Sequence, residues 1–424
     1  MQPGRAPHTL VVNFNSPELN HLALALAQHG QLSRYVRPYV NKDRWWERCL
    51  GELPLTGRLV AGSFGRRRLK DAGLSALTQE AGVWADLCAA SFVRLPGLPA
   101  AHRHHWASAM RKQVRVAVAQ EAARHAPRAG CVVAYEGFAL PAFEALRTGA
   151  RAVLSYPVAH HRTRRRVRDE ENKREPAFAA SWPGFDDWPD GHEQRLDAEI
   201  DRADAVLVGS TYARDTFVAE GVPAAKLRVV PYGVDLTLFH PNAEPRPREA
   251  TFNVIFTGQL TQRKGLSYLL RGYRQFQRAD SHLTLVGSFV GGLQALRPFA
   301  DLFEHVPHRP RAALAAIYRA SDVFVFPTLV EGMPLVVLEA MACGLPVIVT
   351  ANGPGDIVRD GIDGFIIPER DEDALCDRLE RLYSDRDLRL QMGRNAAARA
   401  REFSWDAYGD AARACLVDVV AGSA

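Results

Sequence analysis

Short runs of apolar residues alternate with longer amphipathic stretches along almost the whole chain. In the first half, the apolar runs predict buried strands at Thr9–Phe14, Cys131–Tyr135, Ala152–Tyr156, Ala205–Gly209 and Leu227–Pro231. The amphipathic stretches between them predict helices at Pro17–His29, Trp106–His125 and Thr211–Glu220. Near-continuous apolar strands separated by helices are typical of a parallel sheet that is covered on both faces.

The alternation stops around His240 and restarts after Pro241–Arg248, a polar, proline-rich connector of the kind that joins domains. Beyond it we expect strands at Thr251–Thr257, Ser281–Val286, Asp322–Phe326, Pro346–Thr350 and Gly364–Ile367. Helices are predicted at Lys264–Gln277, Ala312–Ala320 and Leu335–Ala342, with a largely helical tail from Asp371. The pattern therefore predicts two tandem Rossmann-like, doubly wound α/β domains, residues 1–234 and 235–404. Such domains bind ligands at the carboxyl ends of their strands, in the cleft between them.

The composition, 47% apolar and 24% charged residues over 424 positions, is that of a globular protein. The first residues lack the pattern of a signal peptide, and no apolar stretch reaches the roughly 18 residues that a membrane span needs. The 6 cysteines are scattered, without a C-x-x-C pair. This spacing argues against a structural zinc site and for reduced thiols in a cytoplasm.

Two clusters, Arg66–Lys70 and Arg162–Arg168, hold much of the positive charge in a chain of net charge +5. Neither has the interleaved aromatic residues or the recognition motif of a nucleic-acid site, so we expect no nucleic-acid partner. Two interpretations stay open. The clusters are either solvated loops and helix faces, or contacts to anionic lipid or a phosphorylated acceptor.

The most informative segment is Pro327–Val347, which predicts a strand end, a loop with Glu331 and Gly332, and a helix from about Pro334. A loop-to-helix junction offers backbone N–H groups and the positive end of the helix dipole, which suits a phosphate. Glu331 and Glu339 could face one cleft and accept hydrogen bonds from sugar hydroxyls. The alternative is that Glu331 is an acid at a helix start and Glu339 a solvated helix residue.

A second candidate lies at Gly258–Gly265, directly after the strand that ends at Thr257. A glycine turn followed by the adjacent cations Arg263 and Lys264 predicts a diphosphate clamp. Fixed cations there would stabilise a departing nucleoside diphosphate without a metal ion.

Polar side chains at two strand ends of the first domain are further candidates. His160 and His161 follow the strand at Ala152–Tyr156, and Glu136 with Gly137 follows the strand at Cys131–Tyr135. The histidines are well placed for the cleft, although a histidine in such a position is often structural. Glu136 is a candidate for the acceptor side.

Several other chemistries are not indicated. Asp371-Glu-Asp373 and Asp385-Arg-Asp387 match the spelling of a metal-binding motif, but both lie at expected helix starts, where aspartate caps the helix. We therefore expect no metal site. The chain also has no G-x-x-x-x-G-K-[ST] phosphate loop, G-x-G-x-x-G opening or G-x-S-x-G nucleophile elbow.

An ordered set of motifs runs from about Ala203 to Trp405. They are ADAVLVGSTYARDTF, PYGVDLTLFHP, EGMPLVVLEAMACGLPVIVT with its E-x7-E spacing, Gly361-Ile-Asp-Gly-Phe365 and Phe403-Ser-Trp405. This set closely resembles the family-4 retaining glycosyltransferases of the GT-B fold (glycosyl transferases group 1). The resemblance implies that the last helix, residues 405–424, crosses back onto the first domain.

The resemblance also implies roles for individual residues. Glu339 would bind the ribose of the nucleotide, Glu331 the transferred sugar, and Lys264 the diphosphate. His160, or His161 in its place, would contact the donor sugar. The remaining donor-site positions are expected to act through their backbone or beside the cations: Gly258, Gln259, Arg263, Gly332, Met333, Pro334 and Leu335.

Two positions depart from the family pattern. Gln259 stands where the family usually has Arg or Ser, and Arg263 could take over that contact. The usual Gly-Gly loop after the first strand reads Asn13-Phe-Asn15-Ser16-Pro17 here. We expect Ser16 to cap the following helix, and Asn15 and Ser16 to offer side-chain hydrogen bonds on the acceptor side.

By resemblance, we expect a hexosyltransferase without metal or other cofactor. It would move a sugar from a nucleotide-diphosphate sugar to a glycan, lipid-linked or small-molecule acceptor with retention, in cell-envelope glycan or glycolipid synthesis. The expected location is the cytoplasm, with peripheral contact at the inner face of the membrane. A sugar phosphorylase of the same fold, a nucleotide-sugar epimerase and a non-catalytic scaffold subunit remain as alternatives.

Overall fold

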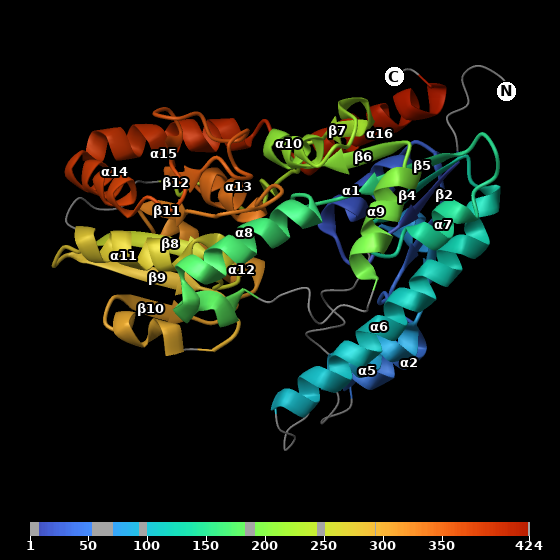
Figure 1. Cartoon of the computed structure of the whole chain (residues 1–424), viewed down its shortest axis with the longest axis horizontal. Coiled ribbons are helices and arrows are strands. Elements are labelled where there is room, and N and C mark those ends of the chain that lie inside the picture. Colours follow the sequence, from blue (N-terminus) through green and yellow to red (C-terminus); the bar gives the residue numbers. More distant parts are fainter. Residues whose placement is uncertain are drawn as a thin grey trace. The chain divides into compact units, whose positions relative to one another are not determined.

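The computed structural model describes residues 8–52, 71–92, 100–182, 191–243, 251–292 and 294–422 (Figure 1). The chain separates into two compact units. The first consists of Met1–Tyr156, Gly191–Leu207 and Gly409–Ala424, and the second of Pro157–Asp190 and Val208–Tyr408. Compared with the expected division at residue 234, residues 157–190 and 208–234 belong to the second unit.

The first sheet has seven strands in the order β3-β2-β1-β4-β5-β6-β7, and the pairs from β3 through β6 are parallel. The strands are β1 (Thr9–Val12), β2 (Leu32–Arg37), β3 (Thr78–Glu80), β4 (Cys131–Tyr135), β5 (Arg151–Ser155), β6 (Ala205–Val208) and β7 (Leu227–Val229). The central strands β1 and β6 are buried along their whole length, which explains their near-continuous apolar sequence.

The helices of the first unit connect these strands. They are α1 (Pro17–Gln28), α2 (Trp45–Glu52), α4 (Ala72–Leu77), α5 (Val83–Phe92), α6 (Ala100–His125), α7 (Leu140–Glu144) and α9 (His192–Arg202), with the 3-10 turn η1 (Ala126–Arg128). On α1, Leu19, Leu22 and Leu26 recur on one face and are buried against the sheet.

The second sheet is parallel throughout, in the order β10-β9-β8-β11-β12-β13. Its strands are β8 (Phe252–Thr257), β9 (Ser281–Val286), β10 (Phe303–Val306), β11 (Val323–Phe326), β12 (Val347–Thr350) and β13 (Gly364–Ile367). Two parallel sheets, each interleaved with helices, confirm the expected pair of Rossmann-like domains.

The second unit holds most of the remaining helices. They are α8 (His161–Arg174), α10 (Thr211–Ala219), α11 (Leu266–Phe276), α12 (Arg311–Arg319), α13 (Leu335–Ala342), α14 (Glu372–Ser384) and α15 (Arg386–Ala400). Short 3-10 turns are η2 (Pro176–Ser181), η4 (Ala224–Lys226), η5 (Gln262–Lys264) and η6 (Gln294–Phe299). The last helix, α16 (Trp405–Ala421), begins in the second unit and continues in the first, where Gly409 lies against Ala25 of α1.

Three strands were not predicted, β2, β3 and β10. β3 and β10 are edge strands, and in β2 the half-buried Ser33 and Arg34 interrupt the buried positions. Strands of this kind lack a continuous apolar run. Among the described residues, none of the helices combines the length and the apolar character that crossing a bilayer requires.

Candidate functional site

Two cations and one carboxylate meet in the second unit. Arg263 Nη1 lies 2.7 Å from Glu331 Oε1, and Lys264 Nζ lies 3.4 Å from the same oxygen. The cations are in η5, after β8, and Glu331 is in the loop after β11. Since β8 and β11 are parallel neighbours, their carboxyl ends meet at one edge of the sheet. The predicted clamp and the predicted sugar-binding acid are therefore one cluster.

Burial sets the electrostatics of this cluster. Glu331 and Lys264 are 8% and 9% exposed. Burial alone would raise the pKa of Glu331, but the charges of Arg263 and Lys264 outweigh it and hold that pKa below its usual value. Burial lowers the pKa of Lys264, against the attraction of Glu331. The carboxylate stays ionised, and Lys264 is a buried cation, not a solvated one at the surface.

Two glycines allow the chain to approach closely here. Gly265 begins α11 at a φ of 72°, and a Cβ at this position would lie 2.0 Å from the carbonyl oxygen of Pro327. A Cβ at Gly332 would lie 1.8 Å from the carbonyl oxygen of Pro157. Only glycine fits at either position, so both loops of the site depend on its missing side chain.

Glu339 has a different cation partner, which was not predicted. It lies on α13, is 6% exposed, and its Oε1 accepts a hydrogen bond from Arg311 Nη2 at 2.9 Å. Burial raises the pKa of Glu339, although Arg311 opposes this effect. A solvated role for Glu339 is therefore wrong. Arg311 is the first residue of α12, and a cation at a helix start is unfavourable to the helix dipole, which is the signal that could have found it.

The loop from Gly332 to Leu335 is fixed from the neighbouring segment. Ser210 Oγ donates to the carbonyl oxygen of Gly332 at 2.6 Å, and the backbone N–H of Tyr232 donates to Met333 Sδ at 2.9 Å. Pro334 precedes α13 and supplies no side-chain cap to that helix. An uncapped helix start is compatible with a bound anion. Leu335 is the first helical residue.

In the turn after β8, Gly258 is half-buried and Gln259 is exposed.

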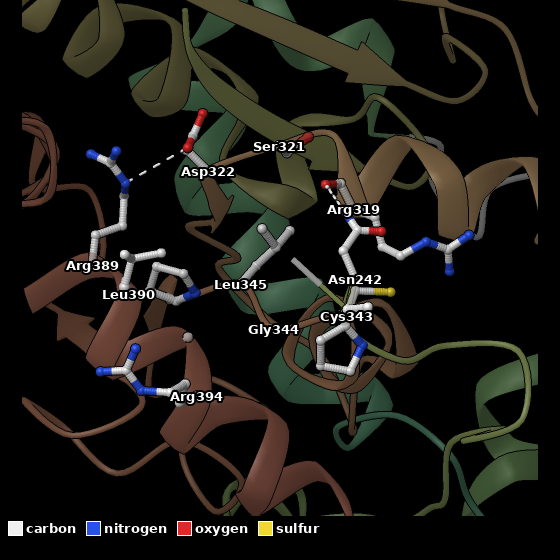
Figure 2. Close-up of a pocket in the computed structure, with 14 residues that line it drawn as sticks. Asn242, Arg319, Ser321, Asp322, Cys343, Gly344, Leu345, Arg389, Leu390 and Arg394 are labelled. Carbon is white, nitrogen blue, oxygen red and sulfur yellow. Dashed lines mark hydrogen bonds and ion pairs between the residues drawn. The ribbon is translucent and has the colours of Figure 1, made fainter. Parts of the chain in front are cut away.

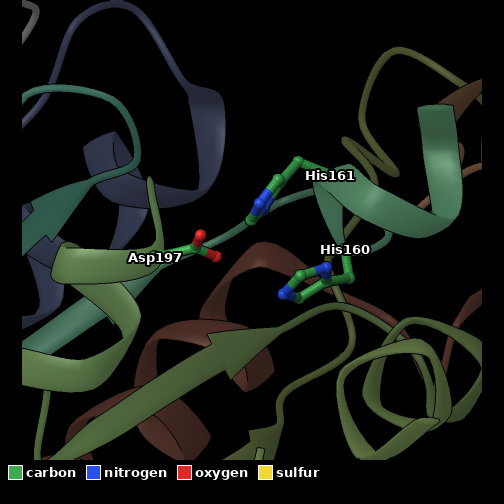
Figure 3. A group of neighbouring side chains, drawn as sticks. All are labelled: His160, His161 and Asp197. Carbon is green, nitrogen blue, oxygen red and sulfur yellow. The ribbon is translucent and has the colours of Figure 1, made fainter. Parts of the chain in front are cut away.

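The two histidines are buried at the start of α8 (Figure 3). Nδ1 of His160 accepts a hydrogen bond from the backbone N–H of Arg162 at 3.2 Å and so caps α8. Its ring stacks on His161 at 4.3 Å and packs edge-on against Phe217 at 4.9 Å. These contacts give His160 a structural role, and contact with a donor sugar stays a prediction. Asp197, also drawn in Figure 3, belongs to α9 of the first unit.

In the first unit, Asn13 holds the loop after β1 in place. This loop has no Gly-Gly pair, unlike the usual family sequence. Its Oδ1 accepts hydrogen bonds from the N–H groups of Asn15 and Ser16, at 2.9 and 2.8 Å. Asn15 has a φ of 150°, in the region that favours glycine, and its side chain accepts a hydrogen bond from Arg37. Ser16 precedes α1, but its side chain makes no capping hydrogen bond, so that prediction is wrong.

Glu199 was also missed, and it holds the loop of Glu136. It lies on α9, is fully buried, and accepts hydrogen bonds from the N–H groups of Gly137 and Ala139, both at 2.7 Å, and of Leu140 at 3.3 Å. Burial raises its pKa to about 7, although these N–H groups oppose the shift. The sequence feature that could have identified Glu199 is an acidic residue on the apolar face of α9, whose buried members include Leu196 and Ile200. Glu136 itself is half-buried.

Residues 251–385 match the family described as glycosyl transferases group 1. The D-inositol 3-phosphate glycosyltransferase of Paenarthrobacter aurescens (strain TC1) is 33% identical over 232 residues, which cover 50% of this chain and 56% of that protein. The enzyme of the same name from Corynebacterium jeikeium (strain K411) is 30% identical over 237 residues, 50% of this chain and 57% of that one. The chain thus spans little more than half the length of these curated relatives.

Solved structures show the same fold. Sucrose-phosphate synthase from Thermosynechococcus elongatus matches with a TM-score of 0.64 at 20% identity, covering 99% of this chain and 100% of that chain. Anabaena HepE in complex with UDP and glucose matches with a TM-score of 0.60 at 14% identity, covering 97% and 99%. Residues 251–385 thus resemble the glycosyl transferases group 1, and the two sheets have the fold of these solved structures.

The basic run Arg162–Arg168 forms the first turns of α8. Arg166 pairs with Glu220 at 2.9 Å and Arg168 with Asp169 at 3.0 Å. The run is thus part of a helix and has carboxylate neighbours. The other cluster, Arg66–Lys70, lies outside the described residues.

The two D-x-D sequences cap helices, as expected. Asp371 accepts a hydrogen bond from the N–H of Ala374 at 2.8 Å, at the start of α14. Asp385 accepts one from the N–H of Leu388 at 2.9 Å, at the start of α15.

A pocket of the second unit lies away from the predicted donor site (Figure 2). Ser321 and Asp322 line it just before β11, and Leu345 and Pro346 just before β12. It is therefore at the amino ends of these strands, whereas GT-B family ligands are expected at the carboxyl ends. Arg389 Nε lies 3.7 Å from Asp322 across this pocket. None of the predicted donor-site residues is among the described residues that line it.

Proposed function

We propose that the protein transfers a sugar from a nucleotide-diphosphate sugar to an acceptor hydroxyl, with retention of anomeric configuration and without a metal ion. The observation that carries this proposal is the buried cluster of Arg263, Lys264 and Glu331 at the carboxyl end of β8. The structural neighbour HepE is known in complex with UDP-glucose, which supports a nucleotide sugar as donor.

The cluster suits the departure of a diphosphate. When the bond between the anomeric carbon and the phosphate oxygen breaks, negative charge develops on the leaving group. Arg263 and Lys264 would stabilise that charge, since cations held in a buried site act more strongly than in water. Glu331 balances their charge in the free protein and would then accept hydrogen bonds from the sugar hydroxyls.

In the proposed reaction the acceptor oxygen bonds to the anomeric carbon on the face from which the diphosphate leaves. The acceptor proton passes to an oxygen of the leaving diphosphate, so atoms and charge balance. Glu339 would hold the ribose hydroxyls in place of its present partner Arg311, whose side chain is 50% exposed and can move away.

For the acceptor side, we propose the loops of Asn15 and of Glu136, since both follow central strands of the first sheet at their carboxyl ends. The Glu199 contacts and the Asn13 contacts hold these loops in place. An acceptor hydroxyl would be bound there by side chains, because no Gly-Gly loop is present.

We also propose peripheral contact with anionic membrane surface, through the arginines of α8. Arg165 and Arg166 are exposed on this helix. Each cation near an anionic surface contributes about 1 kcal/mol to binding.

The proposed function is tested by screening nucleotide sugars for a rise in melting temperature, since a ligand that binds the native state stabilises it. A donor that binds is then incubated with acceptors, beginning with D-inositol 3-phosphate, which appears in the names of the relatives. NMR of the product anomer should show retention. Inversion would contradict the mechanism. Transfer only from a sugar phosphate would identify a phosphorylase, and binding without turnover of any donor would identify a scaffold.

A further inference from the structure

Glu171 is a buried carboxylate on α8 that the proposed reaction does not use. Its side chain is fully buried. Oε1 accepts hydrogen bonds from Gln262 Nε2 and from the hydroxyl of Tyr268, both at 2.7 Å. Oε2 accepts a hydrogen bond from Arg370 Nε at 2.9 Å. A buried charge is costly unless it is paired and hydrogen-bonded, and here each oxygen has its donors.

Gln262 links this carboxylate to the two cations. It is 1% exposed and directly precedes Arg263 and Lys264 in η5. Its backbone N–H donates to Ser181 Oγ at 2.9 Å. Its side-chain oxygen accepts a hydrogen bond from the N–H of Ser267 at 3.1 Å, and its Nε2 donates to Ser267 Oγ at 2.6 Å as well as to Glu171.

Every hydrogen-bonding atom of the Gln262 side chain is therefore engaged, and its orientation is fixed. Its oxygen has to face the N–H of Ser267, and its nitrogen has to face Glu171. The carboxylate, which can only accept hydrogen bonds while ionised, enforces this orientation. The turn that carries Arg263 and Lys264 is thus held from α8 and from the start of α11 together.

We propose that Glu171 is a positioning residue for the diphosphate clamp. It acts through Gln262 and touches neither donor nor acceptor. Cations that are held before the ligand arrives need no reorganisation when charge develops on the leaving group, so loosening their turn weakens the contacts to phosphate. This inference rests on the proposed function, since it assumes that Arg263 and Lys264 bind the diphosphate.

The test compares nucleoside diphosphates with monophosphates. Calorimetry measures the affinity of the wild type for UDP, GDP and ADP and for UMP, GMP and AMP. The ratio of the diphosphate affinity to the monophosphate affinity is the β-phosphate increment. In Glu171→Gln, the single amide nitrogen would face either the donors of Gln262 and Tyr268 or the donor of Arg370, so one side of the network would lose its acceptor. We expect the β-phosphate increment to fall about tenfold, the loss typical when a supporting contact to a site residue is removed. Monophosphate affinity should change by less than about twofold.

The matched control is Glu175→Gln, at the C-cap position directly after α8. The carboxylate of Glu175 is paired with Arg271 of α11 at 2.6 Å. This variant should lower the melting temperature but leave the β-phosphate increment unchanged. A purely structural role for Glu171 would predict the same result for both variants.

Two further variants keep the test decisive if Glu171→Gln does not fold. Tyr268→Phe removes one donor to Glu171, and Gln262→Met removes the link itself while keeping a similar volume. Both should reduce the β-phosphate increment. Where Glu171→Gln folds, combining it with Gln262→Met should add little to either single loss, because both break one link.

The outcomes separate this inference from the proposed function. An unchanged β-phosphate increment in Glu171→Gln, or in Tyr268→Phe and Gln262→Met together, overturns the positioning role and leaves the proposed function standing. A wild-type protein that binds none of the diphosphates overturns both.

Discussion

Arg311 and Glu339 are joined by an ion pair of 2.9 Å between the guanidinium Nη2 and the carboxylate Oε1. The guanidinium is half exposed, whereas the carboxylate is 8% exposed. The pair is therefore open on one side only, and a ligand could take the place of Arg311. If Glu339 holds the ribose, Glu339→Gln should weaken binding of the free nucleoside diphosphate by about 1.5–3 kcal/mol, the usual loss for a charged hydrogen-bond acceptor.

Calorimetry with the nucleoside diphosphate that the wild type binds checks this result. Glu304→Gln is the matched control, because Glu304 is an exposed acid of the same unit, on the edge strand β10. Unchanged affinity in Glu339→Gln would remove Glu339 from the nucleotide site.

Arg263→Ala should reduce kcat/KM on the order of 10²-fold, as expected when one preorganised donor to a developing charge is lost. In this background, Gln259→Arg should restore part of the activity, because an arginine at the exposed turn after β8 would bring a second cation to the same loop. Steady-state kinetics on both variants measure the effect. Full activity of Arg263→Ala would show that Lys264 acts without it.

The pH dependence of stability should report on Glu199. Its folded-state pKa of about 7 lies above the ordinary value of 4.5, so between these values the native state binds more protons than the unfolded state. This contribution is therefore fully present below about pH 4.5 and is lost as the pH rises through 7, by an amount on the order of 3 kcal/mol. Urea midpoints from pH 5 to 8 should fall in the wild type.

Glu199→Gln should flatten this slope while lowering stability at every pH. The amide offers one acceptor oxygen for the N–H groups of Gly137, Ala139 and Leu140 and places a donor near them. A variant with the wild-type slope would assign the proton uptake to another group.

Activity should survive exhaustive chelation, because Arg263 and Lys264 are proposed to carry leaving-group stabilisation. Transfer is measured before and after treatment with EDTA. An enzyme that loses activity in the chelator and regains it with manganese or magnesium would contradict this assignment.

Replacing the exposed Arg165 and Arg166 with Gln should reduce binding to anionic liposomes, most visibly at low salt, since the attraction decays over a Debye length of about 8–10 Å. The melting temperature should barely change. A variant with Trp84→Ser and Trp106→Ser is the comparison, because these side chains are 75% and 51% exposed on α5 and α6 of the first unit. Equal binding by wild type and arginine variant, with loss in the tryptophan variant, would move the membrane contact to that unit. No binding by any of them would leave the α8 arginines as a solvated helix face.

The apolar pattern predicted the strands whose sequences are mainly apolar. The predicted bounds of β4, β9 and β13 agree with the structure, whereas β3 and β10 were missed because they carry polar residues, Gln79 and Glu80 in β3 and Glu304 and His305 in β10. The α8 helix was missed for a related reason: its first turns are dominated by arginine and carry little apolar periodicity.

Part of the candidate site could be predicted from the order of the strands. Arg263, Lys264 and Glu331 each follow a strand of the same sheet, so topology alone brings them together. Glu171, Glu199 and Arg311 lie on helices, and their partners lie 91, 62 and 28 positions away in the chain. A polar residue on a helix reveals a buried role only when its distant partner is known.

The last part of α16, from Gly409 onward, groups with a unit whose first strand begins at Thr9. During synthesis, the contacts of the first unit with α16 can therefore form only after residue 409 has been translated. The second unit has all its strands earlier, by Ile367. Long-range closure of this kind slows folding. The early strands of the first unit therefore lack the cover of α16 until that helix has been synthesised.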